Sequence, residues 1–232
     1  MLPPLVLSGT LGLAIISLAA TAGTDSADQS AYSDKWADGS NGGSGFNPWK
    51  LTTVDSGGNC GFFLGDSKSL ASGSGGDINS GGKSFGMFGQ GKDNRAEAYR
   101  GFAAPLAKGQ SASVDIAVNY RNGQKGDDLR GTDDKTLFNL NIGADDYIVY
   151  EAATGTGSIG SDYSNNTVFK LSFEQTSDSG GTWTVTRSGG ISKTATGTYT
   201  GVAAGLKFYV LEAEKGSEND FCVNHLATTG AP

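Results

Sequence analysis

The chain has 232 residues, a net charge of −7 at pH 7, and 37 glycines against 5 prolines. This length suits one large domain, and hydrophobic residues at 37% are enough to fill a core. No stretch of the chain is rich in Lys and Arg, which argues against nucleic-acid binding, because that function requires clustered basic residues.

The N-terminus is typical of a secretory signal peptide. Residues 5–22 are apolar or small, and Ala20-Thr21-Ala22 is a small-x-small cleavage pattern. The absence of Lys or Arg before the apolar run departs from the usual signal-peptide pattern. The alternative is an uncleaved membrane anchor, which needs about 20 apolar residues, and this stretch is marginal for that length. We predict residues 1–22 to be a signal peptide and the mature protein to be secreted or held at the cell surface, without membrane attachment. Residues 23–45 are predicted to be a flexible polar lead.

Short alternating runs separated by glycine-rich breaks follow along the chain. Residues 113–120 alternate apolar and polar side chains, as a half-buried strand does, and residues 136–142, 167–176 and 181–189 repeat this pattern. The breaks between the runs, such as SDSGG and RSGG, are turn-forming sequences. These runs predict β-strands.

A helix is suggested in one place, residues 93–107, where Gly101 and Pro105 weaken it. About twelve short strands with polar outer faces predict an all-β fold with two antiparallel sheets packed as a sandwich. We expect a jelly roll in which residues 46–228 form a single domain and residues 229–232 a tail.

Six segments share the strand and turn texture of one group of proteins: SNGGSGFNPWKL, GFFLGDS, SFGMFG, AYRGFAAPLAKGQSASVDI, NGQKGDDLR and GGTWTVTRSGG. Together they resemble exported bacterial β-sandwich domains of the concanavalin A-like, lectin and glucanase type. The resemblance covers residues 32–228 and implies a jelly roll in an extracellular or surface protein. It carries over no catalytic residues.

The two cysteines, Cys60 and Cys222, lie near the two ends of the expected sandwich. An even number of cysteines in an exported protein favours a disulfide, and the first and last strands of a sandwich are often neighbours. A bridge that closes so long a loop would stabilise the fold by up to about 5 kcal/mol. We predict this disulfide, with two buried free thiols as the alternative.

The most highly charged stretch is RNGQKGDDLRGTDDK, residues 121–135. A calcium loop would gather carboxylates with few cations, whereas this stretch balances four cations against four anions. The balance predicts a solvated hairpin turn whose surface ion pairs add little stability. The alternative is a ligand or calcium site formed by Asp127, Asp128, Asp133 and Asp134; no other cofactor is expected.

Catalytic residues are scarce. Glycoside hydrolysis needs two carboxyl groups across a sugar bond, and Glu212 and Glu214 form the best pair because they share one face of an expected strand. The following Lys215 and Gly216 indicate an exposed strand end, so we expect no catalysis by this pair. The chain has one histidine, His225, and no second histidine supports a zinc site or a triad around it.

Sugar binding needs flat aromatic faces beside polar groups. Trp36, Trp49 and Trp183 are the candidates for these faces, and core packing is their alternative use. We predict an exported, non-catalytic module that binds an extracellular glycan or surface polymer. The competing hypotheses are a structural or adhesive surface protein that binds other chains or itself, and a glycoside hydrolase.

Overall fold

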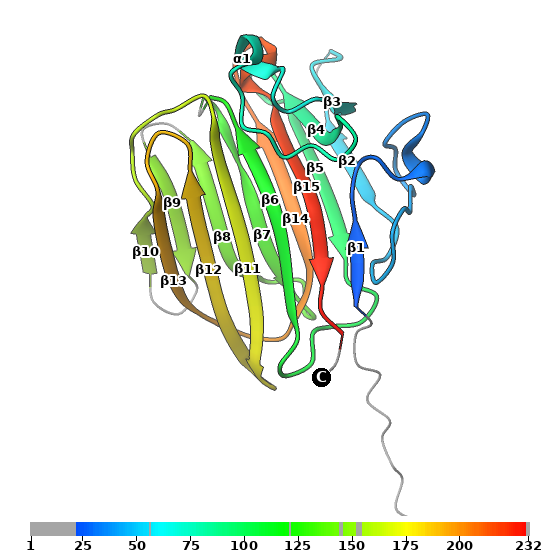
Figure 1. Ribbon diagram of the computed structural model, residues 1–232, viewed down its shortest axis with the longest axis vertical. Coiled ribbons are helices and arrows are strands. Elements are labelled where there is room, and N and C mark those ends of the chain that lie inside the picture. The colour runs from blue at the N-terminus through cyan, green and yellow to red at the C-terminus, as the bar shows by residue number, and fades with distance from the viewer. Residues whose placement is uncertain (1–21, 56, 121, 144–145, 152–154, 231–232) are drawn as a thin grey trace, which may run out of the picture.

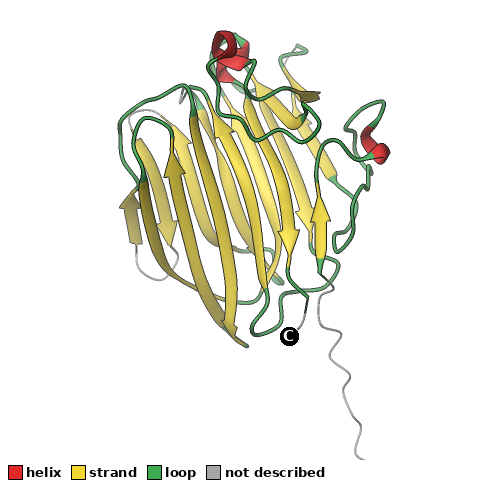
Figure 2. Cartoon of the chain, viewed as in Figure 1, coloured by secondary structure: helices red, strands yellow, loops and turns green. Residues whose placement is uncertain are grey.

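The computed structural model describes residues 22–55, 57–120, 122–143, 146–151 and 155–230, and their regular secondary structure is almost entirely β-strand (Figure 2). They form fifteen strands in two antiparallel sheets, which confirms the predicted all-β sandwich. More strands are found than the twelve expected because short strands, such as the three-residue β1 and the four-residue β10, show no readable alternation. The predicted signal peptide lies outside the described residues, except for Ala22.

The two sheets are stacked face to face, with the first sheet in front in Figure 1. Its strands, in spatial order, are β13 (Lys193–Thr200), β12 (Gly180–Ser188), β11 (Thr167–Ser177), β6 (Ser111–Val118), β15 (Phe221–Thr228), β4 (Ser84–Gly89) and β3 (Cys60–Gly65), with β1 (Gly23–Asp25) beside β15. Those of the second sheet are β10 (Gly155–Ser158), β9 (Asp146–Glu151), β8 (Thr136–Gly143), β7 (Gln124–Gly131), β14 (Ala203–Leu211), β5 (Arg95–Gly101) and β2 (Lys50–Val54).

The core lies between the sheets and follows the alternation of the sequence. In β11, for example, Phe169, Leu171 and Phe173 are buried, while the residues between them are exposed. Facing side chains from the second sheet, such as Phe138, pack against them edge to face. The alternating runs were therefore reliable guides to both the strands and their inner faces.

The suggested helix at residues 93–107 is wrong, because this segment contains the strand β5. Ala96 and Ala98 point into the core and Glu97 and Tyr99 point outward, so the period is two residues and not 3.6. The many Ala, Glu and Arg residues favour helix by propensity, and burial of the alanine face between the sheets overrides that preference.

Residues 23–45 are not a flexible lead. β1 pairs with β15, and Tyr32 and Trp36 are buried in the main core. Asp25 lies 2.7 Å from Arg100 of β5 in an ion pair that is fully shielded from solvent. A buried guanidinium needs a partner, so this ion pair fixes the N-terminal segment between the two sheets.

A long connection, residues 66–83, folds over one end of the outer face of the first sheet (Figure 1). It contains α1 (Leu70–Gly73), and its Leu70 and Ile78 form a small second core with Ala117 and Cys222. The remaining helices of the described chain are two 3-10 turns, η1 (Ser30–Tyr32) and η2 (Ser217–Asn219). None of these helices has the length and hydropathy needed to cross a bilayer.

Candidate functional site

The three tryptophans are core residues. Trp36, Trp49 and Trp183 are 3%, 1% and 4% exposed, and the first two pack against the ring of Phe85. None of them presents a ring to solvent, so their prediction as binding platforms is wrong. The aromatic faces of a binding site have to come from other residues.

The predicted disulfide is also wrong. Cys60 pairs with Gly89 of β4, and Cys222 pairs with Gly86 from the other side of the same strand. Two strand spacings, about 10 Å, therefore separate the cysteines, whereas a disulfide requires Cα atoms within about 7 Å. Both are free thiols, Cys60 against the main core and Cys222 in the second core below α1.

The charged stretch 121–135 is not a solvated turn, because most of it is the strand β7 in the middle of the second sheet. Lys125 and Asp127 point inward and are fully buried, while Asp128 and Arg130 point to the outer face. Charged residues at inner positions hid the alternation that marks the other strands.

The buried charges of β7 have unusual ionisation. Lys125 Nζ donates to the carbonyl oxygens of Tyr120 (2.7 Å) and Asn219 (2.8 Å), and burial lowers the pKa of Lys125 to about 7. Burial raises the pKa of Asp220 to about 7 and that of Asp127 well above its usual range. Neither carboxyl oxygen of Asp127 has a hydrogen-bond partner within the described residues.

The four aspartates of this stretch are not brought together as a metal site. Asp127 and Asp128 lie on opposite faces of β7, Asp133 pairs with Lys135 at 2.5 Å, and Asp134 pairs with Arg130 at 3.0 Å. In the part of the chain that the structure describes, no three His, Cys, Asp or Glu side chains gather in a way that could hold a metal.

Glu212 and Glu214 do not share one face of a strand. Both lie beyond the end of β14, and Glu212 has a φ of 54°. The Asp93 N–H donates to Glu212 Oε1 at 3.3 Å, whereas at Glu214 the backbone N–H is bonded to Asn122. Neither contact brings the two carboxyl groups together, which gives no support to a catalytic pair.

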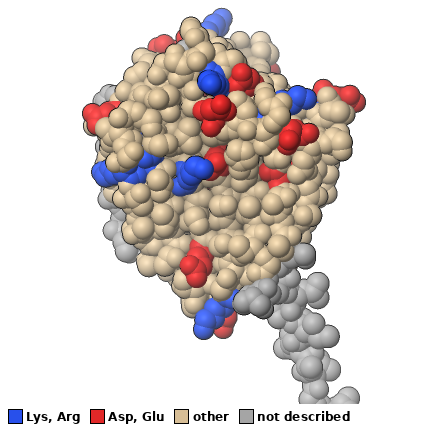
Figure 3. Space-filling view, in the orientation of Figure 1, with Lys and Arg blue, Asp and Glu red and all other residues tan. Residues whose placement is uncertain are grey.

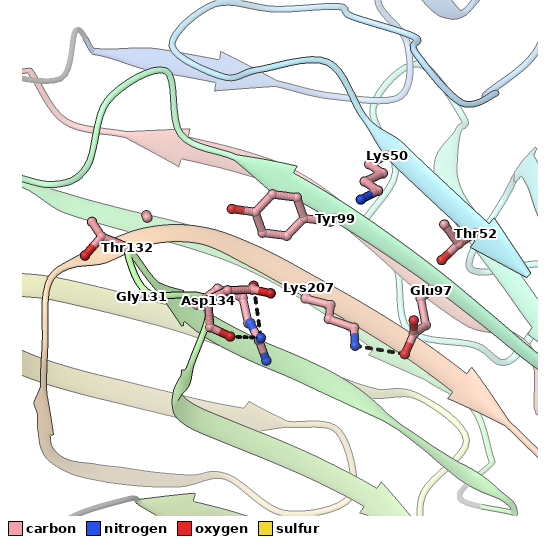
Figure 4. A pocket seen from close by; sticks show the side chains of 10 residues that line it. Lys50, Thr52, Glu97, Tyr99, Gly131, Thr132, Asp134 and Lys207 are labelled. Carbon is pink, nitrogen blue, oxygen red and sulfur yellow. Dashed lines mark hydrogen bonds and ion pairs between the residues drawn. The ribbon is translucent and has the colours of Figure 1, made fainter.

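The structure instead forms a groove on the outer face of the second sheet, with a volume of about 530 Å³ (Figure 4). Four neighbouring strands contribute to it, β2, β5, β14 and β7, together with the turn that follows β7. The residues that line the groove are Lys50, Thr52, Glu97, Tyr99, Arg130, Gly131, Thr132, Asp134, Ala204 and Lys207. A concave site of this size can hold a small ligand or a few units of a polymer.

Tyr99 provides an aromatic surface in the groove. Its ring lies against Gly101 and Gly205, which face each other across β5 and β14; a Cβ at Gly205 would come within 2.6 Å of the Tyr99 hydroxyl. Two opposed glycines leave the space in which the ring lies over the sheet. Burial of one side of the ring raises the pKa of Tyr99, so the hydroxyl is a neutral hydrogen-bonding group.

Charged side chains surround this ring and are partly held in place. Lys207 Nζ lies 2.8 Å from Glu97 Oε1, and Arg130 is bonded to Asp134, as the dashed lines in Figure 4 show. Lys50 points into the groove, and no ion pair to a carboxylate is found for it among the described residues. Donors and acceptors thus lie side by side around the aromatic ring.

A polar network extends the outer face beyond the groove. Asn139 Nδ2 donates to Asp128 Oδ1 at 2.8 Å and to the Tyr209 hydroxyl at 2.9 Å, while Asn141 Nδ2 donates to the same hydroxyl at 3.0 Å. Gly126 leaves room for Tyr209, since a Cβ there would lie 2.8 Å from its hydroxyl. The alternation of residues 136–142 is consistent with both asparagines on an outer face, but it does not reveal the side chains that meet them.

A second hollow of about 270 Å³ lies on three of the four strands that form the groove, β2, β5 and β14, toward their other end. It is lined by Val54, Asp93, Asn94, Arg95, Leu211 and Glu212. Val54 and Arg95 lie four residues from Lys50 and Tyr99, so about 13 Å separates the two hollows along the strands. The outer face of the second sheet therefore has two hollows in line along the strands, and not one isolated pocket.

No protein-family model and no curated protein sequence matches this chain. Among solved structures it is similar to a sialidase, with a TM-score of 0.59 and 11% identity over 91% of this chain and 18% of the sialidase. Weaker similarities include a family 11 carbohydrate-binding module of a Clostridium thermocellum cellulase (TM-score 0.36, 12% identity, 85% of this chain and 95% of that one). Another is an alginate lyase from Alteromonas sp.272 (TM-score 0.37, 10% identity, 73% and 94%).

The likeness to the sialidase supports the class of fold, a two-sheet jelly-roll sandwich, which agrees with the concanavalin-like resemblance found in the sequence. The chain spans only 18% of the length of the sialidase, and at these identities the likeness concerns the fold alone.

Proposed function

We propose that this chain binds a glycan in the groove on the outer face of the second sheet and does not cleave the glycan there. The observation that supports the proposal is the position of Tyr99, a flat ring in an open groove with Lys50, Lys207 and Glu97 around it. Sugars present an apolar ring face and a rim of hydroxyl groups, and this arrangement offers a counterpart for each. The second hollow on the same strands favours a chain of several sugar units.

Binding without hydrolysis is the form that the carboxyl groups of the groove favour. Glu97 is bonded to Lys207 and Asp134 to Arg130, so each carboxylate already has a cationic partner. A glycosidase needs one carboxyl group kept protonated beside a second that is ionised. We therefore expect no release of reducing sugar from a glycan that the groove binds.

Substitution of Tyr99 tests this function. Tyr99→Ala removes the stacking surface and should weaken glycan binding at least about tenfold, equivalent to about 1.4 kcal/mol, in calorimetry with a glycan selected on an array. Tyr150→Ala is the matched control, because Tyr150 is 41% exposed on β9 of the same sheet but does not line the groove. Equal losses in both variants, or none in Tyr99→Ala, would contradict the assignment of the groove.

Export is part of the proposal, because a module that binds extracellular glycans acts outside the cell. Neither the β-sandwich fold nor the two free cysteines bears on export, so this part of the proposal rests on the N-terminal sequence. The mature secreted protein should begin at Gly23, which mass spectrometry of the culture medium would establish.

One observation favours the second candidate function, a structural or adhesive protein that binds copies of itself. Within the described residues β13 pairs only with β12, and its eight residues contain no proline and one charge, Lys193. Long edge strands with so few charges can pair with strands from other chains. Around Gly197 its sequence is symmetric in threonine, so an antiparallel copy would place Thr196 opposite Thr198.

The self-association hypothesis has its own test. Thr196→Lys with Thr198→Lys should abolish any dimer seen in sedimentation, while the same pair of changes at Thr182 and Thr186 of the inner strand β12 should not. Mixing the lysine variant with a Thr196→Glu, Thr198→Glu variant should restore a dimer, because opposite charges then face each other. A protein that stays monomeric at high concentration would exclude this candidate.

A further inference from the structure

The outer face of the first sheet brings together a serine, a histidine and an aspartate that lie far apart in the sequence. His225 Nδ1 is 2.9 Å from Asp115 Oδ2, and His225 Nε2 is 3.0 Å from Ser80 Oγ. From this geometry we propose that Ser80, His225 and Asp115 form a catalytic triad that hydrolyses exposed carboxylic esters with a small acyl group. A triad was not expected around His225, the one histidine of the chain, and its two partners lie 110 and 145 residues away in the sequence.

The hydrogen bonds fix the roles of the two ring nitrogens. An ionised carboxylate can only accept, so Nδ1 must carry the hydrogen that it donates to Asp115. In the neutral imidazole, Nε2 is then the free acceptor and takes the hydrogen bond of the Ser80 hydroxyl. This is the tautomer that a general base needs in order to remove the proton of a serine nucleophile.

The backbone at His225 supports a specialised role. His225 has a φ of 54°, in the left-handed region that side chains other than glycine rarely adopt, and the pairing of β15 with β6 shifts register between Asn224 and Ala227. A bulge of this kind re-aims a side chain, and such irregularities are common beside active sites. Here it directs the imidazole toward both partners at once.

The neighbouring Asn224 secures the turn that carries Ser80. Asn224 is fully buried, and its Nδ2 donates to the carbonyl oxygens of Ile78 (2.8 Å) and Lys83 (3.1 Å), which flank Ser80 on both sides. Because Asn224 precedes His225 directly, one short segment of β15 holds both the base and the turn of the nucleophile. The distance between Ser80 and His225 is therefore set by buried contacts.

The turn itself can supply an oxyanion site. Ser80 and Lys83 are joined by two backbone hydrogen bonds of 2.9 Å, with Gly81 and Gly82 between them at φ values of 54° and 76°. Within the described chain, the N–H groups of these two glycines make no hydrogen bond. An N–H directly after a nucleophilic serine is well placed to stabilise the negative oxygen that forms on its substrate.

The setting of the triad limits its substrate. The His225 side chain is 41% exposed, while that of Asp115 is 16% exposed and also accepts a contact from Lys170 at 3.5 Å. Neither hollow of the second sheet includes these residues. A site that is this open to solvent suits a small acyl group, such as an acetyl ester on the surface of a polymer.

The proposed reaction is ester hydrolysis in two steps. Ser80 Oγ forms a bond to the acyl carbon while its proton passes to His225 Nε2, and that proton leaves with the alcohol when the C–O bond of the ester breaks. A water molecule then attacks the acyl-serine with Nε2 as its base, which releases the carboxylic acid and restores the Ser80 hydroxyl.

Active-site labelling provides the first test. A fluorophosphonate probe should label the full chain at Ser80, identified by peptide mass spectrometry, and the label should be lost in Ser80→Ala. Ser113→Ala is the matched control, since Ser113 lies on the same face of β6, two residues from Asp115. Absence of labelling at Ser80, or equal labelling of the two variants, would overturn the triad.

Kinetics with p-nitrophenyl acetate provide the second test. Ser80→Ala should lower kcat by about 100-fold or more and abolish the acyl-enzyme, while Asp115→Asn should lower kcat and leave KM unchanged. Retention of the full rate in Ser80→Ala would show an exposed histidine acting alone and would overturn the proposal. p-Nitrophenyl octanoate should be a poorer substrate than the acetate, and Ser80→Ala should bind glycan in the groove as the unaltered protein does.

Discussion

The outer faces of the two sheets rest on equally regular strands, yet they differ in chemistry. On β12 and β13, the outward residues are mostly threonines, and a band below the middle of this face carries few charged side chains (Figure 3). On β5, β14 and β7, the outward residues are tyrosine, glutamate, lysine and arginine, joined by ion pairs and hydrogen bonds. The inward-facing residues of the strands thus form the core that stabilises the fold, and the outward-facing residues can differ between the two sheets.

The bonding pattern separates the two faces more clearly than their composition does. Thr186 and Thr194 share a hydroxyl contact of 3.3 Å on the threonine-rich face. On the groove face, Tyr209 alone accepts from two asparagines, and Lys207 is tied to Glu97. A ligand therefore meets side chains that are already ordered on the groove face, which lowers the entropy cost of binding.

The largest expected effect on stability comes from removing the buried ion pair that joins the two sheets. Arg100→Met leaves Asp25 buried without its cation and should lower the free energy of unfolding by about 3–5 kcal/mol in urea denaturation. Asp25→Val combined with Arg100→Met should recover much of this loss, because both buried charges are then gone. A single Arg100→Met variant as stable as the unaltered protein would show that the ion pair does not join the sheets.

A smaller effect of opposite sign is expected inside β7. The Asp127 carboxyl is buried and lacks a partner among the described residues, so Asp127→Val should raise the free energy of unfolding by about 1–3 kcal/mol. Asp127→Asn keeps a polar group in the same place and should bring no such gain. Destabilisation by valine would mean that the carboxyl has a bound partner, such as an internal water molecule.

The fold was largely predictable from the sequence because the alternation of apolar and polar residues can be seen within each strand's own sequence. The strands β6, β8, β11 and β12 coincide closely with residues 113–120, 136–142, 167–176 and 181–189. β7 escaped because Lys125 and Asp127 occupy inner positions, where apolar side chains are expected. Its burial depends on partners such as the Asn219 carbonyl, which no local pattern reveals.

The candidate sites were not predictable, since both depend on which strands become neighbours. Tyr99 and Lys207 face each other across β5 and β14, more than a hundred residues apart, and the Tyr99 ring lies against a glycine of each strand. The tryptophans drew attention by residue type, although large aromatic residues near the sheet centre are needed for the core. A tyrosine at an outward position near glycines was the feature of the sequence that could have indicated the groove. It can be recognised only when the pairing of the strands is known, because one of the glycines lies on a neighbouring strand.

The pH dependence of stability should reflect the buried groups at the inner end of β7. Asp220 has a folded pKa of about 7, above its unfolded value, so its contribution to stability is lost as pH rises from about 4 to 7. Lys125 has a folded pKa of about 7, below its unfolded value, so stability recovers between pH 7 and about 10. Urea denaturation should show a minimum near pH 7, with changes of a few kcal/mol, and Asp220→Asn should reduce the change on the acidic side.

The smallest effect returns to the two outer faces and uses one substitution on each. Thr184→Val on β12 should change the free energy of unfolding by less than about 0.5 kcal/mol, because valine matches threonine in shape and in preference for strands. Thr52→Val in the groove should be equally mild for stability but should weaken glycan binding several-fold if the proposed function holds, since Thr52 lines the groove and its hydroxyl is lost. If the two variants bind glycan equally well, the groove is not where the sugar lies; if Thr184→Val alone loses binding, the threonine-rich face is the binding surface instead.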